Sequence, residues 1–124
     1  MKLENEKCSN SLVCAIRGVV NALKTEKNLR IDFIIAICII AFSFAVKISF
    51  FEWMVCLVSI GLMLSAELFN TAIEYFVDMY TREKNEMAGK IKDISAGAVL
   101  ILSLNIAIVG IIIFLPKIYG IILG

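Results

Sequence analysis

Long apolar stretches alternate with short polar ones along this chain of 124 residues. A membrane-spanning helix needs about 20 mostly apolar residues, and the pattern predicts three such helices, over about 30–47, 51–80 and 94–115. Pro116 is expected to end the third helix, because proline lacks the backbone N–H that a helix interior uses. The pattern therefore predicts an all-α membrane protein.

The segment before the first membrane helix has a periodicity of its own. Arg17, Asn21 and Lys24 lie on other faces than the apolar positions, which recur at helical spacing. Those apolar positions are Leu12, Ile16, Val19, Val20 and Leu23. The spacing predicts an amphipathic helix over about 9–25 that rests on the membrane surface; a simple anchor is the alternative to a functional role. Residues 1–8 are expected to be frayed.

The second predicted membrane helix becomes polar along one face in its C-terminal half. Glu67, Asn70, Glu74 and Asp78 fall within about 80° of one another, at about 100° per residue. If the helix enters the bilayer near Glu52, Glu67 lies roughly 5–8 Å inside the hydrocarbon, at a rise of 1.5 Å per residue. A carboxylate at that depth is costly, and it indicates a functional site.

Composition and charge agree with a membrane protein and give it an orientation. The chain is 60% hydrophobic, and all 12 lysines and arginines except Lys47 and Lys117 precede the first membrane helix or lie between the second and third. Cytoplasmic segments carry an excess of basic residues. We therefore expect a cytoplasmic N-terminus and a cytoplasmic 79–93 loop, with the 47–52 turn and the C-terminus outside. The polar N-terminus lacks a signal-peptide pattern.

Cysteine and histidine usage narrows the possible chemistry. Cys8, Cys14, Cys38 and Cys56 lack the spacing of a metal or disulfide motif, and all four are expected to be reduced packing residues. The chain has no histidine, which excludes histidine-based catalysis and disfavours a transition-metal site.

Acidic side chains at the membrane boundary suit phosphoryl transfer to a lipid alcohol. Mg²⁺ takes oxygen ligands, often one or two carboxylates together with phosphate oxygens, and Glu26 with Glu74 could supply that pair. Glu67, which lies deeper, could act as general base toward a lipid hydroxyl. Lys92 and Asp93 could hold a nucleotide.

Other interpretations of the same residues remain open on physical grounds. Glu26 is also explained as a solvated turn acid or as a partner of Lys27 or Arg30. The signatures of soluble kinases are absent. A proton or cation pathway, or a non-enzymatic channel or assembly subunit with polar helix contacts, is compatible with the stripe of acids.

Two long motifs settle the choice by resemblance. They are Glu-Leu-Phe-Asn-Thr-Ala-Ile-Glu at 67–74 and Ala-Gly-Lys-Ile-Lys-Asp-Ile-Ser-Ala-Gly-Ala-Val at 88–99. With the 22–30 segment, they resemble the prokaryotic diacylglycerol kinase and undecaprenol kinase family. The resemblance covers nearly the whole chain. It implies a single membrane domain over 1–124, a surface helix with three membrane helices, and a homotrimer with active sites shared between subunits.

The resemblance also implies roles for individual residues. Glu67 matches the catalytic base, and Asn70 matches a neighbouring active-site amide. Glu26 and Glu74 match the carboxylates that hold Mg²⁺ and ATP, while Asp78 supports the polar face. The further residues that align with nucleotide contacts are Glu83, Lys84, Asn85, Lys92 and Asp93. Two positions depart from the family pattern: Met79 replaces a residue that is often basic, and Asn85 replaces one that is often histidine.

The lipid acceptor is chosen by likeness within the family. Glu52-Trp53, the 70–74 segment and the 23–30 segment look more like undecaprenol kinases than diacylglycerol kinases. We therefore expect undecaprenol as the acceptor in the cell membrane, with diacylglycerol as the alternative. Both lipids present a primary alcohol at the interface, so physical reasoning alone does not separate them. No nucleic-acid partner is expected.

Overall fold

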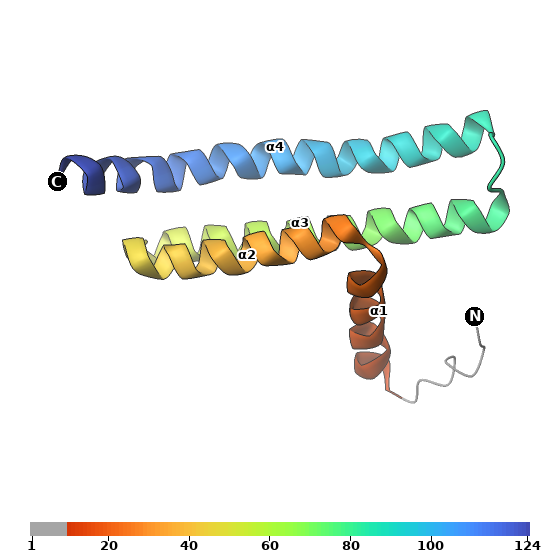
Figure 1. Ribbon diagram of the computed structural model, residues 1–124, viewed down its shortest axis with the longest axis horizontal. Coiled ribbons are helices and arrows are strands. Elements are labelled where there is room, and N and C mark those ends of the chain that lie inside the picture. The colour runs from red at the N-terminus through yellow and green to blue at the C-terminus, as the bar shows by residue number, and fades with distance from the viewer. Residues whose placement is uncertain (1–9) are drawn as a thin grey trace.

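Four helices make up the part of the chain that the computed structural model describes, residues 10–124. They are α1 (Ser11–Thr25), α2 (Lys27–Val46), α3 (Phe50–Tyr80) and α4 (Glu86–Leu123). The helices α2, α3 and α4 lie side by side, and α3 packs against both of the others. The short helix α1 stands nearly perpendicular to them at the start of α2 (Figure 1).

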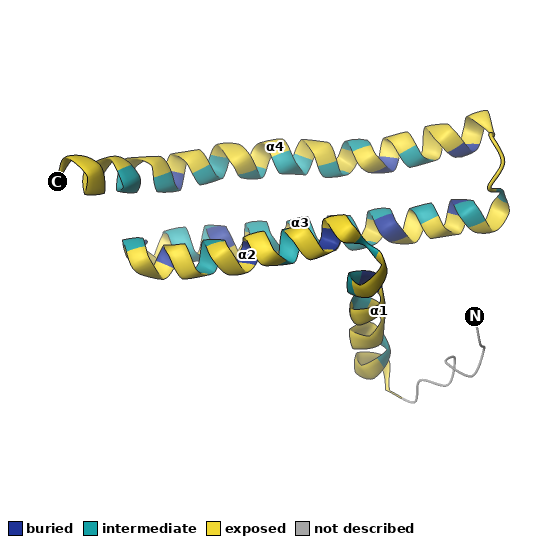
Figure 2. Cartoon of the chain, viewed as in Figure 1, coloured by how far each residue is buried: buried dark blue, intermediate teal, exposed yellow. Residues whose placement is uncertain are grey.

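Three of the four helices are long and apolar enough to cross a membrane: α2, α3 and α4. This confirms the prediction of an all-helical protein with three membrane helices. Most residues of the bundle are exposed, as Figure 2 shows, and many of them are large apolar residues. Such an apolar surface is unfavourable in water, whereas lipid tails solvate it.

Local capping sets where the helices begin and end. Asn10 starts α1, since its Oδ1 accepts a hydrogen bond of 2.9 Å from the Leu12 N–H. Lys47 ends α2 in a left-handed conformation, with φ of 54°. Ser49 and Glu52 then form a capping box at the start of α3. The conformation of Lys47 and this capping box confine the connection between α2 and α3 to a tight turn.

The start of α4 differs from the prediction. The segment 86–93 was expected to belong to a polar loop, but the helix begins at Glu86 and the connection is reduced to residues 81–85. The reason is an N-cap: the Asn85 side chain accepts a hydrogen bond of 3.0 Å from the Ala88 N–H. A polar sequence outside the hydrocarbon can still be helical when its first turn is capped.

The end of α4 also differs, because the helix passes through Pro116 and continues to Leu123. Proline removes one backbone donor, a loss that membrane helices tolerate where neighbouring groups compensate. Directly after the proline, Lys117 Nζ lies 3.0 Å from Glu52 Oε1 at the start of α3. This ion pair connects the last turns of α4 to α3. The expected end of the helix at Pro116 is wrong, because the helix continues to Leu123.

A small apolar core holds the end of the bundle near the 47–49 turn. Its buried members are Ile48, Cys56 and Ile113, one from the turn and one from each of α3 and α4. The Phe42 and Phe114 rings add a contact between α2 and α4, with centroids 5.6 Å apart. The far end of the bundle also buries apolar residues, among them Leu29, Val77 and Ala88, and polar side chains add contacts between its helices.

The cysteines do not all behave as predicted. Cys38 and Cys56 are free thiols, as expected. Cys14 is disulfide-bonded, so the expectation of four reduced cysteines is wrong for this residue. Cys8 and the predicted fraying of residues 1–8 lie outside the described part of the chain.

Candidate functional site

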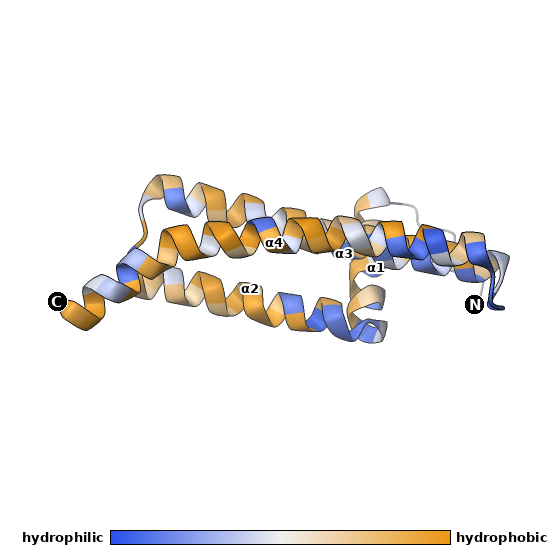
Figure 3. Ribbon diagram, turned by 90° about the horizontal axis from the view of Figure 1, so that it is seen from above, coloured by the Kyte–Doolittle hydropathy of each residue, from blue (hydrophilic) through white to orange (hydrophobic). Residues whose placement is uncertain are grey.

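Polar residues gather at one end of the bundle, where α1 meets α2 and where α3 leads into α4 (Figure 3). The middle of the three long helices is apolar by contrast. Helix α3 connects the two regions, because its first half is apolar and its second half carries the stripe from Glu67 to Asp78. The candidate site is therefore at a boundary between lipid-facing and polar surroundings.

Glu67 lies at the centre of a group of four carboxyl groups. It is half-buried. Its carboxyl lies close enough to the carboxyls of Asp32 on α2, Glu74 and Glu26 to interact with them electrostatically. These four residues, Glu26, Asp32, Glu67 and Glu74, are called the acidic cluster below. The stripe on α3 is thus joined by an acid from the α1–α2 corner and by another from α2.

Asn70 joins α3 to α4 beside the acidic cluster. Its Nδ2 donates a hydrogen bond of 2.7 Å to Glu74 Oε1, and its Oδ1 accepts one of 2.7 Å from the buried Ser95 hydroxyl. Both ends of the amide are therefore engaged. This arrangement fixes the orientation of the amide and, through it, the position of the Glu74 carboxylate.

Glu26 sits at the corner between α1 and α2 and reaches toward α3. Its Oε1 accepts a hydrogen bond of 2.9 Å from the Tyr75 hydroxyl. The same hydroxyl lies 2.8 Å from Thr25 Oγ1. The Tyr75 side chain thus connects the corner to the helix that carries Glu67 and Glu74.

Arg30 has another role than the one considered from sequence. Its Nη1 donates to the carbonyls of Leu23 and Lys24, each at 2.9 Å. These carbonyls belong to the last turn of α1, where the backbone lacks helical partners. Arg30 therefore closes the corner, and the contact that the structure shows for the Glu26 carboxylate is with Tyr75 rather than with Arg30.

Asp78 and Lys92 form the next link between α3 and α4. Lys92 Nζ lies 2.7 Å from Asp78 Oδ1, and the two side chains are 40% and 37% exposed. A pair this exposed contributes at most about 1 kcal/mol to stability. An ammonium group has three donors, so Lys92 can keep this contact and still bind a phosphate oxygen.

The other predicted nucleotide contacts are not drawn into the acidic cluster. Glu83 and Lys84 are exposed in the 81–85 connection, and Asp93 is exposed on α4. The Asn85 side-chain oxygen is used in the N-cap of α4. Among the described residues, the structure gives none of these four side chains a hydrogen bond or ion pair to the cluster.

Three residues of the site escaped the sequence analysis: Asp32, Tyr75 and Ser95. Asp32 carried a usable signal, because it is an acidic residue inside an apolar helix, near the expected level of Glu67. Ser95 lies in the 88–99 motif, but its hydrogen bond to Asn70 was not foreseen. Tyr75 carried no signal, since it lies beside the polar stripe rather than on it.

The donor set fits a magnesium ion held together with phosphate oxygens. Within residues 10–124, no three or more acidic or cysteine side chains form a group that could hold a metal alone. Glu26 and Glu74 each use Oε1 in a described hydrogen bond, and their Oε2 atoms have no partner among the described residues. Mg²⁺ bound through one or two carboxylates and substrate phosphates needs no more than such a pair.

Comparison with known proteins identifies the family. A family model described as prokaryotic diacylglycerol kinase matches residues 13–114, which include the acidic cluster and the residues joined to it. The chain belongs to the prokaryotic diacylglycerol kinase family. The resemblance that the sequence motifs indicated is confirmed.

Several curated relatives of this kinase are similar over most of its length. An undecaprenol kinase of Bacillus subtilis is 40% identical over 107 residues, covering 86% of this chain and 87% of that protein. A diacylglycerol kinase of Haemophilus influenzae is 30% identical over 103 residues, covering 83% and 85%. A diacylglycerol kinase of Synechocystis is 32% identical over 100 residues, covering 80% and 57%.

Family membership decides the class of protein. The relatives are kinases of lipid alcohols, and the chain is a phosphotransferase of this kind. The alternative of a non-enzymatic channel or assembly subunit is therefore excluded.

Proposed function

We propose that this kinase transfers the γ-phosphoryl group of ATP to the primary hydroxyl of undecaprenol, giving undecaprenyl phosphate. The observation that carries the proposal is the acidic cluster at the polar end of helices that are otherwise apolar (Figure 3). A lipid alcohol and a soluble phosphate donor can meet at such a boundary. The 40% identity to an undecaprenol kinase supports the choice of acceptor.

Glu67 is proposed as the general base. Its carboxylate takes the proton of the lipid hydroxyl as the hydroxyl oxygen forms a bond to the γ-phosphorus. The bond from this phosphorus to the β–γ bridging oxygen breaks, and ADP leaves with the electron pair. The proton then passes from Glu67 to solvent at the polar end. Asp32, which lies close to Glu67, and Asn70 hold neighbouring positions and orient the site.

Glu26 and Glu74 are proposed to hold the nucleotide through Mg²⁺. When bound, the ion neutralises the charge of the phosphates during transfer. The Tyr75 and Asn70 hydrogen bonds orient one oxygen of each carboxylate, which leaves the other oxygen for the ion. Asp78 holds Lys92, and Lys92 would contact the phosphates. Glu83, Lys84, Asn85 and Asp93 are proposed for the nucleotide by family resemblance.

The proposal includes an orientation and an assembly. Helix α1 would lie on the cytoplasmic membrane surface, with the N-terminus and the 81–85 connection in the cytoplasm. The half-buried acidic cluster would face another subunit or water in a homotrimer, because polar groups at membrane depth require such surroundings.

Diacylglycerol is the second candidate acceptor. Relatives from Haemophilus influenzae and Synechocystis that are 30% and 32% identical carry the name diacylglycerol kinase. The chemistry at the hydroxyl would be the same, and only the apolar part of the lipid would differ.

An acceptor competition distinguishes the two lipids. Purified protein in detergent with radiolabelled ATP and Mg²⁺ receives undecaprenol and a diacylglycerol in equal amounts. We expect more label in undecaprenyl phosphate than in phosphatidic acid. The opposite preference would overturn undecaprenol as the acceptor while leaving the kinase activity intact, and label in neither lipid would contradict both.

A further inference from the structure

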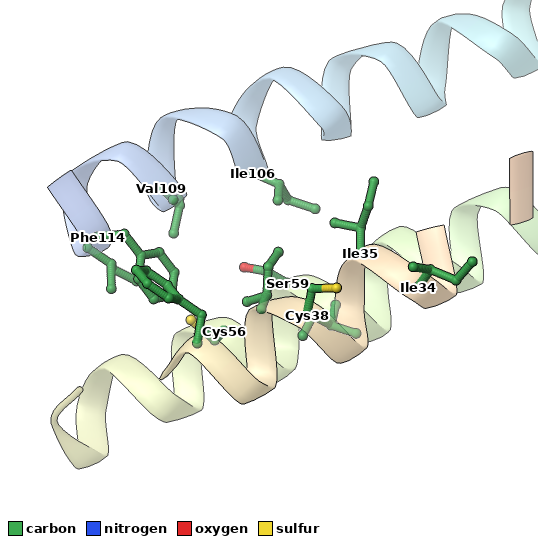
Figure 4. Close-up of a pocket in the computed structure, with 13 residues that line it drawn as sticks. Ile34, Ile35, Cys38, Cys56, Ser59, Ile106, Val109 and Phe114 are labelled. Atoms are coloured by element: carbon green, nitrogen blue, oxygen red, sulfur yellow. The ribbon is translucent and has the colours of Figure 1, made fainter. Parts of the chain in front are cut away.

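A cavity in the apolar part of the bundle is lined by a hydroxyl group that has no hydrogen-bond partner among residues 10–124. The cavity has a volume of about 410 Å³ and lies between α2, α3 and α4 (Figure 4). Its lining is apolar except for Ser59 on α3. The hydroxyls of Ser43 and Ser103 bond to carbonyls of their own helices, whereas the Ser59 hydroxyl has no such partner within residues 10–124.

A second polar group without full pairing lies on the outside of α4. Asn105 is at the middle of this helix and is exposed among apolar residues. Its Nδ2 donates a hydrogen bond of 2.9 Å to the Ile101 carbonyl. In the described part of the chain, its Oδ1 has no donor. An exposed amide in the middle of a membrane span is unfavourable against lipid and favourable against another helix.

The two groups lie at nearly the same depth. Ser103 Oγ of α4 lies 3.7 Å from Met63 Sδ of the antiparallel α3, so these positions share a level. By counting along both helices, Ser59 is level with Ala107. Asn105 is two residues away from that level, about 3 Å at a rise of 1.5 Å per residue. The side chains can cover such a difference.

Ser59 and Asn105 cannot meet within one chain, because Asn105 does not lie on the face of α4 that lines the cavity. Ile106 lines the cavity, and Asn105 is turned by about 100° from it along the helix. A second copy of the chain in the same orientation carries its Asn105 at the same depth. Rotation about an axis along the membrane normal preserves depth, as in any cyclic assembly.

We propose that α4 of a second copy packs over the cavity and that its Asn105 amide bonds to the Ser59 hydroxyl. The Asn105 Oδ1 accepts the hydroxyl proton, which satisfies both groups. The contact also covers exposed apolar residues on both sides: Ile34 and Ile35 (61% and 49% exposed) beside the cavity, and Ile101 and Ile108 (64% and 57%) beside Asn105. Because the two surfaces differ, the contact is heterologous, the type of contact that forms a ring when the rotation between copies closes.

Disulfide trapping between two tagged copies tests this contact. Cys38 and Cys56 line the cavity as well, so both are replaced by alanine. One copy then carries Ser59→Cys and the other carries Asn105→Cys. Bridged cysteines require Cα atoms within about 7 Å. We expect mild oxidation in the membrane to give a covalent dimer that contains both tags.

The matched control replaces Asn105→Cys by Ala107→Cys. Ala107 is exposed and level with Ser59, but it lies on the other flank of α4. We expect little dimer with this pair. Equal trapping at both positions, or trapping with Ala107→Cys alone, overturns the proposal, as does the absence of dimer with Asn105→Cys.

A double-mutant cycle gives a second test, in protein that retains Cys38 and Cys56. Asn105→Leu and Ser59→Ala are compared singly and together by self-association in lipid vesicles. We expect each change to weaken association about threefold or more, the usual scale for a hydrogen bond between membrane helices. The double variant should be no weaker than Asn105→Leu alone. Additive losses, or unchanged association, overturn the pairing.

Discussion

Tyr75 shows how a single hydroxyl organises the corner of the site. It donates to Glu26 Oε1 at 2.9 Å and also meets Thr25. Its removal leaves the Glu26 carboxylate free to change rotamer. In the proposed function, Glu26 holds Mg²⁺ with Glu74, so the loss should appear in the metal requirement rather than in the chemistry of transfer.

We expect Tyr75→Phe to raise the Mg²⁺ concentration for half-maximal lipid phosphorylation about threefold, with a smaller change in the rate at saturating Mg²⁺. This change in the Mg²⁺ requirement corresponds to the loss of a hydrogen bond that contributes about 0.5–1.5 kcal/mol. The measurement is a Mg²⁺ titration at fixed ATP. Tyr80→Phe is the control, because Tyr80 is 82% exposed. An unchanged requirement in Tyr75→Phe would show that this hydrogen bond does not support a metal ligand.

At the scale of the helices, the buried apolar residues Val77 and Ala88 and a set of polar contacts join α3 to α4 near the site. Ser95 meets Asn70, and Lys92 meets Asp78. Helix α4 begins at Glu86, capped by Asn85, and carries both Lys92 and Ser95 within about its first three turns. The cap is therefore part of the site's architecture.

Asn85 separates a structural role from a nucleotide-binding role. Asn85→Ala should lower local stability by about 1 kcal/mol, the typical cost of losing an N-cap. Hydrogen exchange of the amides in 86–90 should quicken about fivefold, and Asn85→Asp should restore protection because aspartate caps as well. If ATP affinity falls in both variants while exchange stays unchanged, the side chain contacts the nucleotide instead.

The elements that the sequence predicted well are those with a strong and uniform pattern. The expected 51–80 helix agrees with Phe50–Tyr80 within one residue, since its apolar run passes without interruption into the stripe of acids. The 86–93 segment was misjudged because a polar helix outside the lipid has no apolar face to reveal it. The continuation of α4 past Pro116 was not predicted. A local sequence pattern does not reveal contacts between helices, such as the ion pair of Lys117 with Glu52.

The candidate site was predictable to the extent that it lies on one helix. The spacing of Glu67, Asn70 and Glu74 places them on a common face, and the structure keeps them together. Asp32, Tyr75 and Ser95 join them by contacts between helices. Such contacts depend on how helices cross, which periodicity within one helix does not determine.

At the scale of the whole molecule, the chain is a scaffold that carries a few acids to a membrane boundary. One end is closed by apolar packing and by the Glu52–Lys117 pair, and the other is held together by hydrogen bonds around the acidic cluster. The apolar end anchors the helices in lipid. In the proposed function, the polar end accepts a nucleotide from water and an alcohol from the membrane.

The central claim is that Glu67 takes the proton of the lipid hydroxyl, and the most direct measurement is phosphoryl transfer by Glu67→Gln. Purified variant and wild type are compared with undecaprenol, ATP and Mg²⁺, alongside nucleotide binding and thermal unfolding. Glu86→Gln, which changes an exposed acid paired to Lys90 at 3.9 Å, is the control. We predict a loss of transfer of about 10²–10⁴-fold, as for a general base, with folding and ATP binding retained. Transfer by Glu67→Gln at the wild-type rate would contradict the account.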